Sequence, residues 1–550
     1  SPEFVPESRM QDMVPVYPQT EGLTSRLIGN AMKEALKRLP EVVNDPIPDD
    51  LRMEYALCRL EYALKTIHFP GSPEELSTAR RRLVFEELLV LQLGMMELRR
   101  AGARENPYPI QKDCTQDFCT LLPFTMTGAQ QRAIGDAMRD MQGKHPMNRL
   151  IQGDVGSGKT AVAAALCYNV IQNGLQAALM APTEILATQH YESLSALLAP
   201  AGIQVALITG STRVKERRAI LAGLSDGSIH LAVGTHALIS EGVEFNNLAL
   251  VITDEQHRFG VGQRTALAKK GNFPHTLVMS ATPIPRTLAL MIYGDLDVSV
   301  LDELPPGRQP IETFLIDPAK RRRAFGYVQK HIDEGRQAYI VCPLIEENDS
   351  DMASVKAYEE ILRGYFKDMP IGVLHGRMKP KEKDAVMADF SAGNTKILLS
   401  TTVVEVGVDV PNAVIMMIEN AERYGLSQLH QLRGRVGRGK HRSTCILVTE
   451  AQNEEAIKRL RIFCSTTDGF KVADEDLRLR GPGDFCGQRQ HGLPKMKIAD
   501  MLNDMQVLSE AQACARRIVE RDPQLSDPAL RGLKAEMRRL FASTGGTVTL

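Results

Sequence analysis

The sequence predicts an α/β protein in which two parallel-sheet domains follow one another along the chain, with helical segments at both ends. Short apolar and β-branched runs alternate with helical stretches from about residue 124 to residue 450, which is typical of parallel sheets covered on both faces. The break at Leu304-Pro305-Pro306-Gly307 divides these runs into two series. The expected strands are 177–181, 205–208, 231–233, 248–253 and 276–279, then 313–316, 338–341, 372–374, 396–400, 414–418 and 444–448.

Both flanks of the sheet region show helical periodicity. Apolar residues recur at spacings of three and four through 27–39, 51–64 and 76–98, with proline-rich breaks between them. Beyond residue 450 the pattern is helical again, apart from a glycine-rich segment at 481–492. We therefore expect a tag remnant with a connecting segment, a helical linker domain, two sheet domains and a C-terminal part with a helical hairpin, a loop and further helices, at 1–23, 24–123, 124–304, 305–450 and 451–550.

Composition limits the function classes. The 550 residues carry 66 basic and 67 acidic side chains, so the net charge of −1 neither favours nor excludes a nucleic-acid partner. The nine cysteines include no C-x-x-C pair, and no apolar run reaches the length of a membrane span. We expect reduced thiols, no zinc, no membrane contact, and a soluble cytoplasmic monomer. The basic runs Arg80-Arg81-Arg82 and Arg321-Arg322-Arg323 are interpreted as solvated helix faces.

Residues 153–160, Gly-Asp-Val-Gly-Ser-Gly-Lys-Thr, match the pattern G-x-x-x-x-G-K-[ST] in full. Glycines allow backbone N–H groups to wrap phosphates at a helix N-terminus, Lys159 supplies a positive charge, and the Thr160 hydroxyl can reach Mg²⁺. The alternative is a glycine-rich turn before an ordinary helix. The motif predicts a nucleoside triphosphate site whose contacts are Gly153, Gly156, Ser157, Gly158, Lys159 and Thr160.

An acidic pair follows the apolar run 248–253. Ligands of α/β proteins lie at the carboxyl ends of the strands, so this pair is placed beside the phosphates. We expect Asp254 to hold Mg²⁺ through water and Glu255 to polarise the attacking water. The alternative is an Asp-Glu pair that caps a helix.

A basic segment in the second series supplies candidates for the other side of the phosphates. In Gln431-Leu432-Arg433-Gly434-Arg435-Val436-Gly437-Arg438 the arginines are separated by small residues, so their side chains can protrude into a cleft. A guanidinium from a neighbouring domain stabilises charge that develops on the γ-phosphate and makes hydrolysis depend on domain closure. We expect Arg435 and Arg438 in this role; the alternative is a basic surface loop.

Together these motifs resemble those of a superfamily 2 helicase motor. The string 254–261, Asp-Glu-Gln-His-Arg-Phe-Gly-Val, narrows the resemblance to the RecG branch-migration helicases and the transcription-repair coupling factor. The resemblance covers residues 124–450 and implies two RecA-like domains that use ATP and Mg²⁺. It also implies that Phe124 and Gln130 lie at the adenine and that Gln431 acts with the arginines. Under the same resemblance Thr282 couples hydrolysis to domain movement, and the residues that contact DNA strands are Thr183, Thr235, His236 and Thr401.

Segments 459–461, 479–485 and 487–492 resemble the translocation motif shared by RecG and the coupling factor. Under that resemblance Arg459, Arg480 and Gln490 couple motor closure to movement on duplex DNA. A loop rich in glycine and proline, with long polar side chains, can reposition against phosphates. Without the motor beside it, the same loop would be interpreted as an ordinary glycine turn.

Three functions stay open at this point. The first is an ATP-driven translocase or helicase on double-stranded and branched DNA, such as stalled replication forks and Holliday junctions, in recombination and repair. The second is the motor of a transcription-coupling protein, and the third is a nucleotide-regulated binding protein that scarcely hydrolyses ATP. Residues 16–23 resemble the segment that follows the wedge domain of RecG, which favours the first. Glu255, Arg435 and Arg438 argue against the third. RecG proteins place an OB-fold wedge before the helical linker, and we expect this chain to lack it, most simply by truncation.

Overall fold

The computed structural model divides into two compact units, Arg104–Leu479 and a helical unit made of Ser1–Ala103 and Arg480–Leu550. The domain boundaries expected at residues 123, 304 and 450 stay predictions. Among the described residues, no helix has both the length and the apolar composition needed to cross a membrane. The structure describes residues 13, 15–20, 22–39, 44–101, 104–254, 266–280, 296–305, 310–342, 350–367, 369–401, 410–439, 441–480, 496–500 and 504–542.

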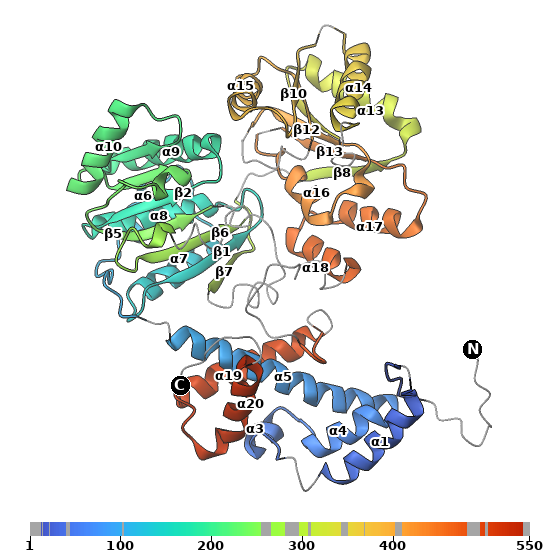
Figure 1. Ribbon diagram of the computed structural model, residues 1–550. Helices are drawn as coiled ribbons and strands as arrows, with labels where there is room; N and C mark the ends of the chain where they lie inside the picture. The colour runs from blue at the N-terminus through green and yellow to red at the C-terminus, as the bar shows by residue number, and fades with distance from the viewer. Residues whose placement is uncertain are drawn as a thin grey trace. The chain divides into compact units, whose positions relative to one another are not determined.

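The first sheet has seven parallel strands in the order β3-β4-β2-β5-β6-β1-β7 (Figure 1). Side chains of β2 alternate between two apolar clusters: Ala177 and Leu179 belong to one, Ala178 and Met180 to the other. Both faces are therefore buried, as is usual for a parallel sheet. The strands are β1 (Asn148–Gly153), β2 (Gln176–Met180), β3 (Val205–Ile208), β4 (Leu231–Gly234), β5 (Leu248–Thr253), β6 (His275–Ser280) and β7 (Asp297–Leu301).

Helices supply the other half of each apolar cluster. Residues 162–171 of the alanine-rich α8 are all buried, and all of them except Asn169 belong to the cluster that also holds side chains of α6, α7 and α9. On the other face, α10 contributes Ile220 and Leu224. The start of α7 is fixed by a capping box between Thr127 and Gln130. These helices are α6 (Thr115–Leu121), α7 (Gly128–Met141), α8 (Lys159–Gln172), α9 (Glu184–Leu198) and α10 (Val214–Asp226).

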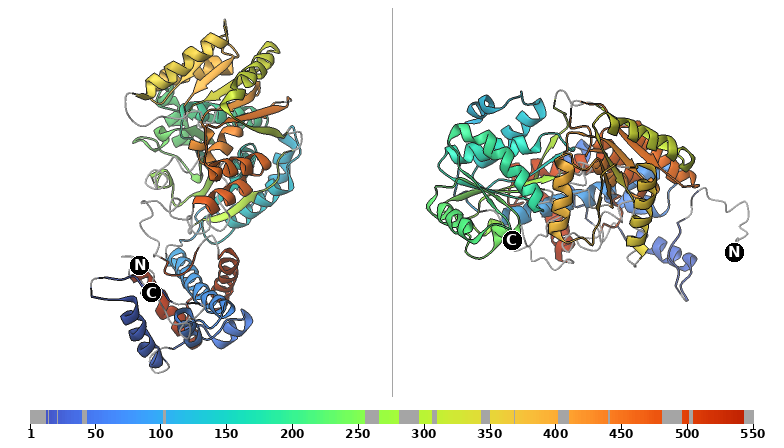
Figure 2. Two further views of the ribbon diagram at one scale, coloured as in Figure 1. Left: turned by 90° about the vertical axis from the view of Figure 1, so that its right-hand side faces the viewer. Right: turned by 90° about the horizontal axis from the view of Figure 1, so that it is seen from above.

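The second sheet has six parallel strands in the order β10-β11-β9-β12-β13-β8. Strand β9 again alternates, with Tyr339 and Val341 in one cluster and Ala338 and Ile340 in the other, so helices flank both faces of this sheet too (Figure 2). The strands are β8 (Ile311–Ile316), β9 (Gln337–Val341), β10 (Ile371–Leu374), β11 (Ile397–Ser400), β12 (Ala413–Ile418) and β13 (Ser443–Val448), and the helices are α13 (Arg321–Asp333), α14 (Ser350–Tyr365), α15 (Pro380–Ser391), α16 (Leu426–Arg433), α17 (Glu454–Ser465) and α18 (Gly469–Arg480).

The helical unit is built around the long helix α5 (Pro73–Ala101). Two helices from the C-terminal part of the chain pack against it, an association that helical periodicity cannot indicate. A Cβ atom on Gly94 would lie 2.0 Å from Cε2 of Phe541, so the glycine allows α20 to approach α5 closely. The other helices of the unit are α1 (Ser25–Lys37), α3 (Asp49–Glu54), α4 (Leu60–His68), α19 (Met505–Arg521) and α20 (Arg531–Ala542).

The run Arg80-Arg81-Arg82 corrects one interpretation made from the sequence. Arg82 is fully buried and pairs with Asp45 and Glu86, the Nη1–Oε2 distance to Glu86 being 2.6 Å. The other two arginines of the run pair with Asp504 and Glu510. The run is therefore not a solvated face, because carboxylates pair with all three arginines, and Asp45, Asp504 and Glu510 come from distant parts of the chain.

Two differences in secondary structure have local causes. The expected helix 51–64 is wrong as one element: α3 ends at Glu54 and α4 begins at Leu60, because Ala56 has a positive φ of 50° between them. Strand β7 was not expected, since its residues Asp297 to Leu301 alternate polar and apolar over only five positions. The predicted α/β class with two parallel sheets is confirmed.

Candidate nucleotide-binding site

The phosphate-binding loop connects the end of β1 to the start of α8. Gly156 and Gly158 have φ values of 77° and 85°, a backbone region that favours glycine. A Cβ atom on Gly158 would also lie 2.2 Å from Nε2 of Gln130, so this position has no room for a side chain. The loop geometry therefore requires the glycines that the motif supplies.

Polar contacts hold the loop from inside. Gln130 donates from Nε2 to the carbonyl of Ser157, at 2.9 Å, while its Oε1 accepts from the amide of Thr127. Lys159 donates from Nζ to the carbonyls of Gly153 and Asp154, at 2.8 and 3.0 Å. The side chain of Ser157 is buried, and within the described part of the chain its Oγ has no hydrogen-bond partner. The lysine amine at the loop is suited to an anionic ligand.

Asp254 follows the last residue of β5, as expected, and its side chain is largely buried. Its Oδ2 lies 2.8 Å from Nε2 of His190, which projects from α9. His190 could not be predicted from the sequence as a partner of Asp254, because one polar residue among several in a helix gives no signal of its partner. The contact fixes the direction of the carboxylate. The next residue, Glu255, lies outside the described residues.

Residues of both sheet domains line one cavity of about 730 Å³. Lys159, Thr160 and Asp254 line it from the first domain, and Arg435 and Arg438 line it from the second. Apolar residues form another part of its wall, including Leu121, Phe124, Leu186, Leu194 and Leu197. A cavity with cations, one carboxylate and an apolar wall can accommodate both the phosphates and the base of a nucleotide.

The chemistry of these residues fits a Mg²⁺ ion. Thr160 and Asp254 present hard oxygen donors to the same cavity, and no cluster of three His, Cys, Asp or Glu side chains able to hold a metal occurs in the described ranges. Mg²⁺ is usually held by one or two carboxylates together with water and substrate phosphates, rather than by a full set of protein ligands.

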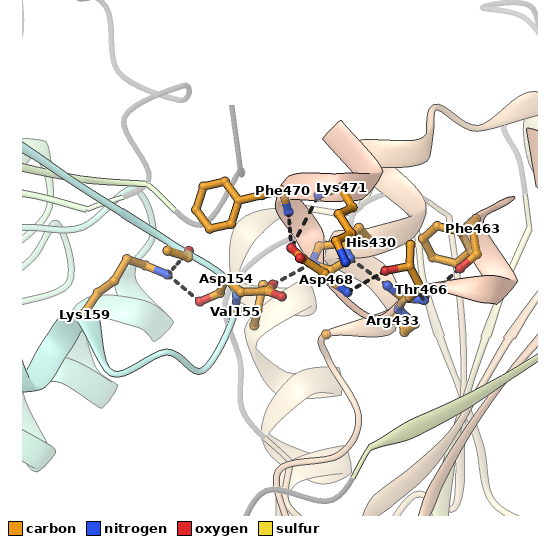
Figure 3. A network of polar contacts seen from close by, with 12 residues as sticks. Asp154, Val155, Lys159, His430, Arg433, Phe463, Thr466, Asp468, Phe470 and Lys471 are labelled. Carbon is orange, nitrogen blue, oxygen red and sulfur yellow. Dashed lines mark hydrogen bonds and ion pairs between the residues drawn. The ribbon is translucent and has the colours of Figure 1, made fainter. Parts of the chain in front are cut away.

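Figure 3 shows a polar network between the phosphate-binding loop and the second domain. Asp154 Oδ1 lies 2.5 Å from His430 Nε2, and Arg433 donates to Nδ1 of the same ring at 2.9 Å. Arg433 also donates to the carbonyls of Phe463 and Thr466. Burial lowers the pKa of the Arg433 guanidinium from its usual value. Neither Asp154, His430 nor Arg433 was assigned a role from the sequence.

The residues expected to contact DNA are dispersed over strand and helix ends. Thr183 caps α9 through Oγ1, Thr235 is buried after β4, and Thr401 is buried after β11. His236 is exposed at the start of a 3-10 turn. Arg459 donates from Nη2 to the carbonyls of Glu422 and Tyr424, so it holds α17 against the second domain.

Several expected site residues do not line the cavity or cannot be placed. Gln431 is buried in α16, and Gln130 lies behind the loop. Thr282 and Gln490 lie outside the described residues, as does the side chain of Arg480.

In a comparison with known proteins, models of protein families match most of the chain. The model described as DEAD/DEAH box helicase matches residues 127–291, and the helicase conserved C-terminal domain matches residues 321–440. The model of the C-terminal part of domain 3 of the ATP-dependent DNA helicase RecG matches residues 466–543. The last match favours RecG over the coupling factor as the source of the resemblance.

Individual relatives agree with these models. The ATP-dependent DNA helicase RecG of Bacillus subtilis is 47% identical over 97% of this chain and 79% of its own length. The RecG of Synechocystis sp. is 49% identical over 93% of this chain, which spans 62% of that relative. A solved structure of RecG bound to a three-way DNA junction superposes with a TM-score of 0.68 at 43% identity, covering 90% of this chain and 66% of that one. The two parallel-sheet domains are accordingly RecA-like, and the chain belongs to the RecG family of ATP-dependent DNA helicases.

Proposed function

We propose that this chain is an ATP-driven motor that moves along double-stranded DNA and acts on branched DNA. One observation carries the proposal: the phosphate-binding loop, Asp254 and the two arginines of the second domain line a single cavity. Hydrolysis at such a cavity requires both domains, so each cycle of hydrolysis can drive one cycle of domain movement. The names of the RecG relatives, and the junction bound in one of their structures, support DNA as the track.

In this proposal each cavity residue has a separate task. Lys159 leaves the carbonyls of Gly153 and Asp154 to contact the β- and γ-phosphates, and Thr160 with Asp254 would hold Mg²⁺, which neutralises phosphate charge when bound. Glu255 polarises the attacking water. Arg435 and Arg438 stabilise the charge that develops on the γ-phosphate during transfer.

The residues around the cavity connect hydrolysis to DNA. Gln130 holds the carbonyl of Ser157, and Phe124 forms part of the apolar wall against which a base can pack. We assign strand contacts to Thr183, Thr235, His236 and Thr401, and coupling to Thr282. We assign Arg459, Arg480 and Gln490 to the coupling of motor closure to movement on duplex DNA.

The test is ATP hydrolysis measured with linear duplex, forked duplex and single-stranded DNA. Duplex and forked DNA should stimulate hydrolysis well above single-stranded DNA, and the stimulation should fall as salt rises because phosphate contacts supply most of the affinity. Lys159→Ala should abolish hydrolysis without changing the circular dichroism spectrum. Substantial DNA-stimulated hydrolysis by Lys159→Ala would remove the phosphate-binding loop from the proposal, and equal stimulation by all three DNAs would remove the preference for duplex.

A further inference from the structure

The network in Figure 3 begins inside the phosphate-binding loop. The carbonyl of Asp154 accepts from Lys159 Nζ, and its Oδ1 accepts from the amide of Val155 at 2.7 Å as well as facing His430. Asp154 is therefore bound on three sides by groups of the loop and of α16. A ligand that draws the lysine amine away from the loop carbonyls changes one of these three contacts directly.

His430 carries the contact across to the second domain. Only 3% of its surface is exposed. Arg433 has no acceptor atom, so it must donate to Nδ1, and Nε2 is then the ring nitrogen that bears the hydrogen donated to Asp154. One tautomer of one ring thus satisfies an acceptor in the first domain and a donor in the second.

Arg433 extends the network to the connection between α17 and α18. Its Nη1 donates to the carbonyl of Thr466 at 2.8 Å and to that of Phe463 at 3.1 Å, and its guanidinium lies 4.1 Å from the centroid of the Phe463 ring. The Thr466 hydroxyl accepts from the amide of Asp468, whose carboxylate accepts from the amide of Phe470 in the first turn of α18. The network therefore ends at the N-terminus of α18.

The backbone after α16 is packed closely against the phosphate-binding loop. A Cβ atom on Gly434 would lie 2.8 Å from Cβ of Val155, so the backbone after α16 is in close contact with the loop. Close-packed contacts transmit a displacement rather than absorb it. A shift of the loop must either move α16 with it or break the Asp154–His430 hydrogen bond.

We propose that His430 is a positioning residue that transmits the state of the phosphate-binding loop, through Arg433, to the connection at 466–471. The inference rests on the proposed function, since it assumes that a nucleotide binds at this loop. The helix controlled in this way is α18, which leads into the segment that we expect to move DNA. His430 acts through its two neighbours and does not itself contact the nucleotide.

Hydrogen exchange of the full chain tests the proposal without relying on activity. Exchange is followed with and without a saturating non-hydrolysable ATP analogue, in peptides that cover the phosphate-binding loop and in peptides that cover 466–471. In the wild type, the analogue should alter exchange in both places, with a change of at least about fivefold at the amides of Phe470 and Lys471, the lower end of usual coupling between sites.

Two variants test separately the two contacts of His430, one with Asp154 and one with Arg433; we call this path from Asp154 to 466–471 the relay. The side chain of asparagine at position 430 can present an oxygen to Arg433 near the place of Nδ1, but it is too short to contact Asp154. The longer side chain of glutamine can contact Asp154, but it leaves the Arg433 donor without the Nδ1 acceptor. Both His430→Asn and His430→Gln should keep the response in the loop and lose it at 466–471. The exposed His441, in the same domain, gives the matched control His441→Asn, which should respond as the wild type does.

A third variant guards against loss of folding. Asp154→Asn keeps an oxygen that can accept from His430, so it should retain the response at 466–471. A wild-type response confined to the loop, or an unchanged response at 466–471 in His430→Asn, would overturn the relay alone. Absence of any response in the wild-type loop would overturn the proposed nucleotide site and the relay with it.

Discussion

Arg82 and Arg433 are both large, fully buried cations, but their charges meet different groups. Arg82, in the helical unit, lies between the carboxylates of Asp45 and Glu86. Arg433, in the second sheet domain, meets a threonine hydroxyl, two backbone carbonyls, the ring of His430 and the face of Phe463. In the part of the chain that the structure describes, no carboxylate is paired with Arg433.

The difference shows what each arginine contributes. A buried ion pair neutralises its own charge and joins two pieces of a scaffold, although it adds little net stability over apolar packing. A buried cation against neutral acceptors is costly to desolvate, which is reflected in the lowered pKa of Arg433. Perturbed groups of this kind cluster at functional sites, and Arg433 lies between the phosphate-binding loop and α18.

The largest expected effect concerns the other arginines of the same segment. Arg435→Ala and Arg438→Ala should lower kcat by a factor on the order of 10³ for the stronger of the two, because a guanidinium at the γ-phosphate acts mainly on the transition state. The affinity for ATP should change far less. Steady-state kinetics at saturating duplex DNA, with Arg80→Ala as the control from the ion-paired run, measures both. A pure rise in KM for both variants would show that these arginines only bind the nucleotide.

The second prediction compares the two buried arginines directly. Arg82→Met leaves Asp45 and Glu86 without their cation, so it should destabilise the helical unit by about 3 kcal/mol, while ATP hydrolysis by the folded protein stays unchanged. Arg433→Met leaves only neutral acceptors behind and should cost about 1–2 kcal/mol, yet it should reduce the distance moved per ATP hydrolysed. Native-state hydrogen exchange of α5 and α16 gives the stabilities. If the two variants lost stability equally and Arg433→Met moved as far per ATP as the wild type, the two arginines would not differ in function.

The smallest effect is a pH dependence in the helical unit. Burial raises the pKa of Glu86 above its usual 4.5, and Arg82 opposes the shift. An acid with a raised pKa binds more protons in the folded than in the unfolded chain, so its stabilising contribution is present below pH 4.5 and is lost as pH rises through the folded-state pKa. The glutamine of Glu86→Gln does not titrate, so the stability of this variant should decline less than that of the wild type above pH 4.5. Parallel stability curves for the two proteins would contradict this assignment.

Much of this architecture could be predicted from the sequence, because continuous apolar runs determine buried parallel strands. The run 248–253 and the run 205–208 coincide with β5 and β3. The loop that we propose binds phosphate could be located because its glycines and its lysine lie in one short segment. Relations between distant residues carry no such local signal.

The residues of the candidate site that were not predicted from the sequence lack a local signal for the same reason. His190 and His430 are each one of several polar residues in a helix, and nothing near either in the sequence indicates a carboxylate partner on another element. The run at 80–82 was interpreted as solvated because its partners at positions 45, 504 and 510 lie far along the chain. Glu255 and Gln490 lie outside the described residues, so their expected roles stay predictions.

Displacement of a third strand from a DNA triplex tests the central claim most directly, because it reports movement along duplex DNA without requiring the duplex to be unwound. With ATP, the chain should release the third strand at a rate that rises with protein concentration. Neither Lys159→Ala with ATP nor the wild type with a non-hydrolysable analogue should release it. A wild-type protein that hydrolyses ATP rapidly on this DNA and leaves the triplex intact would contradict the account, since hydrolysis would then not drive translocation.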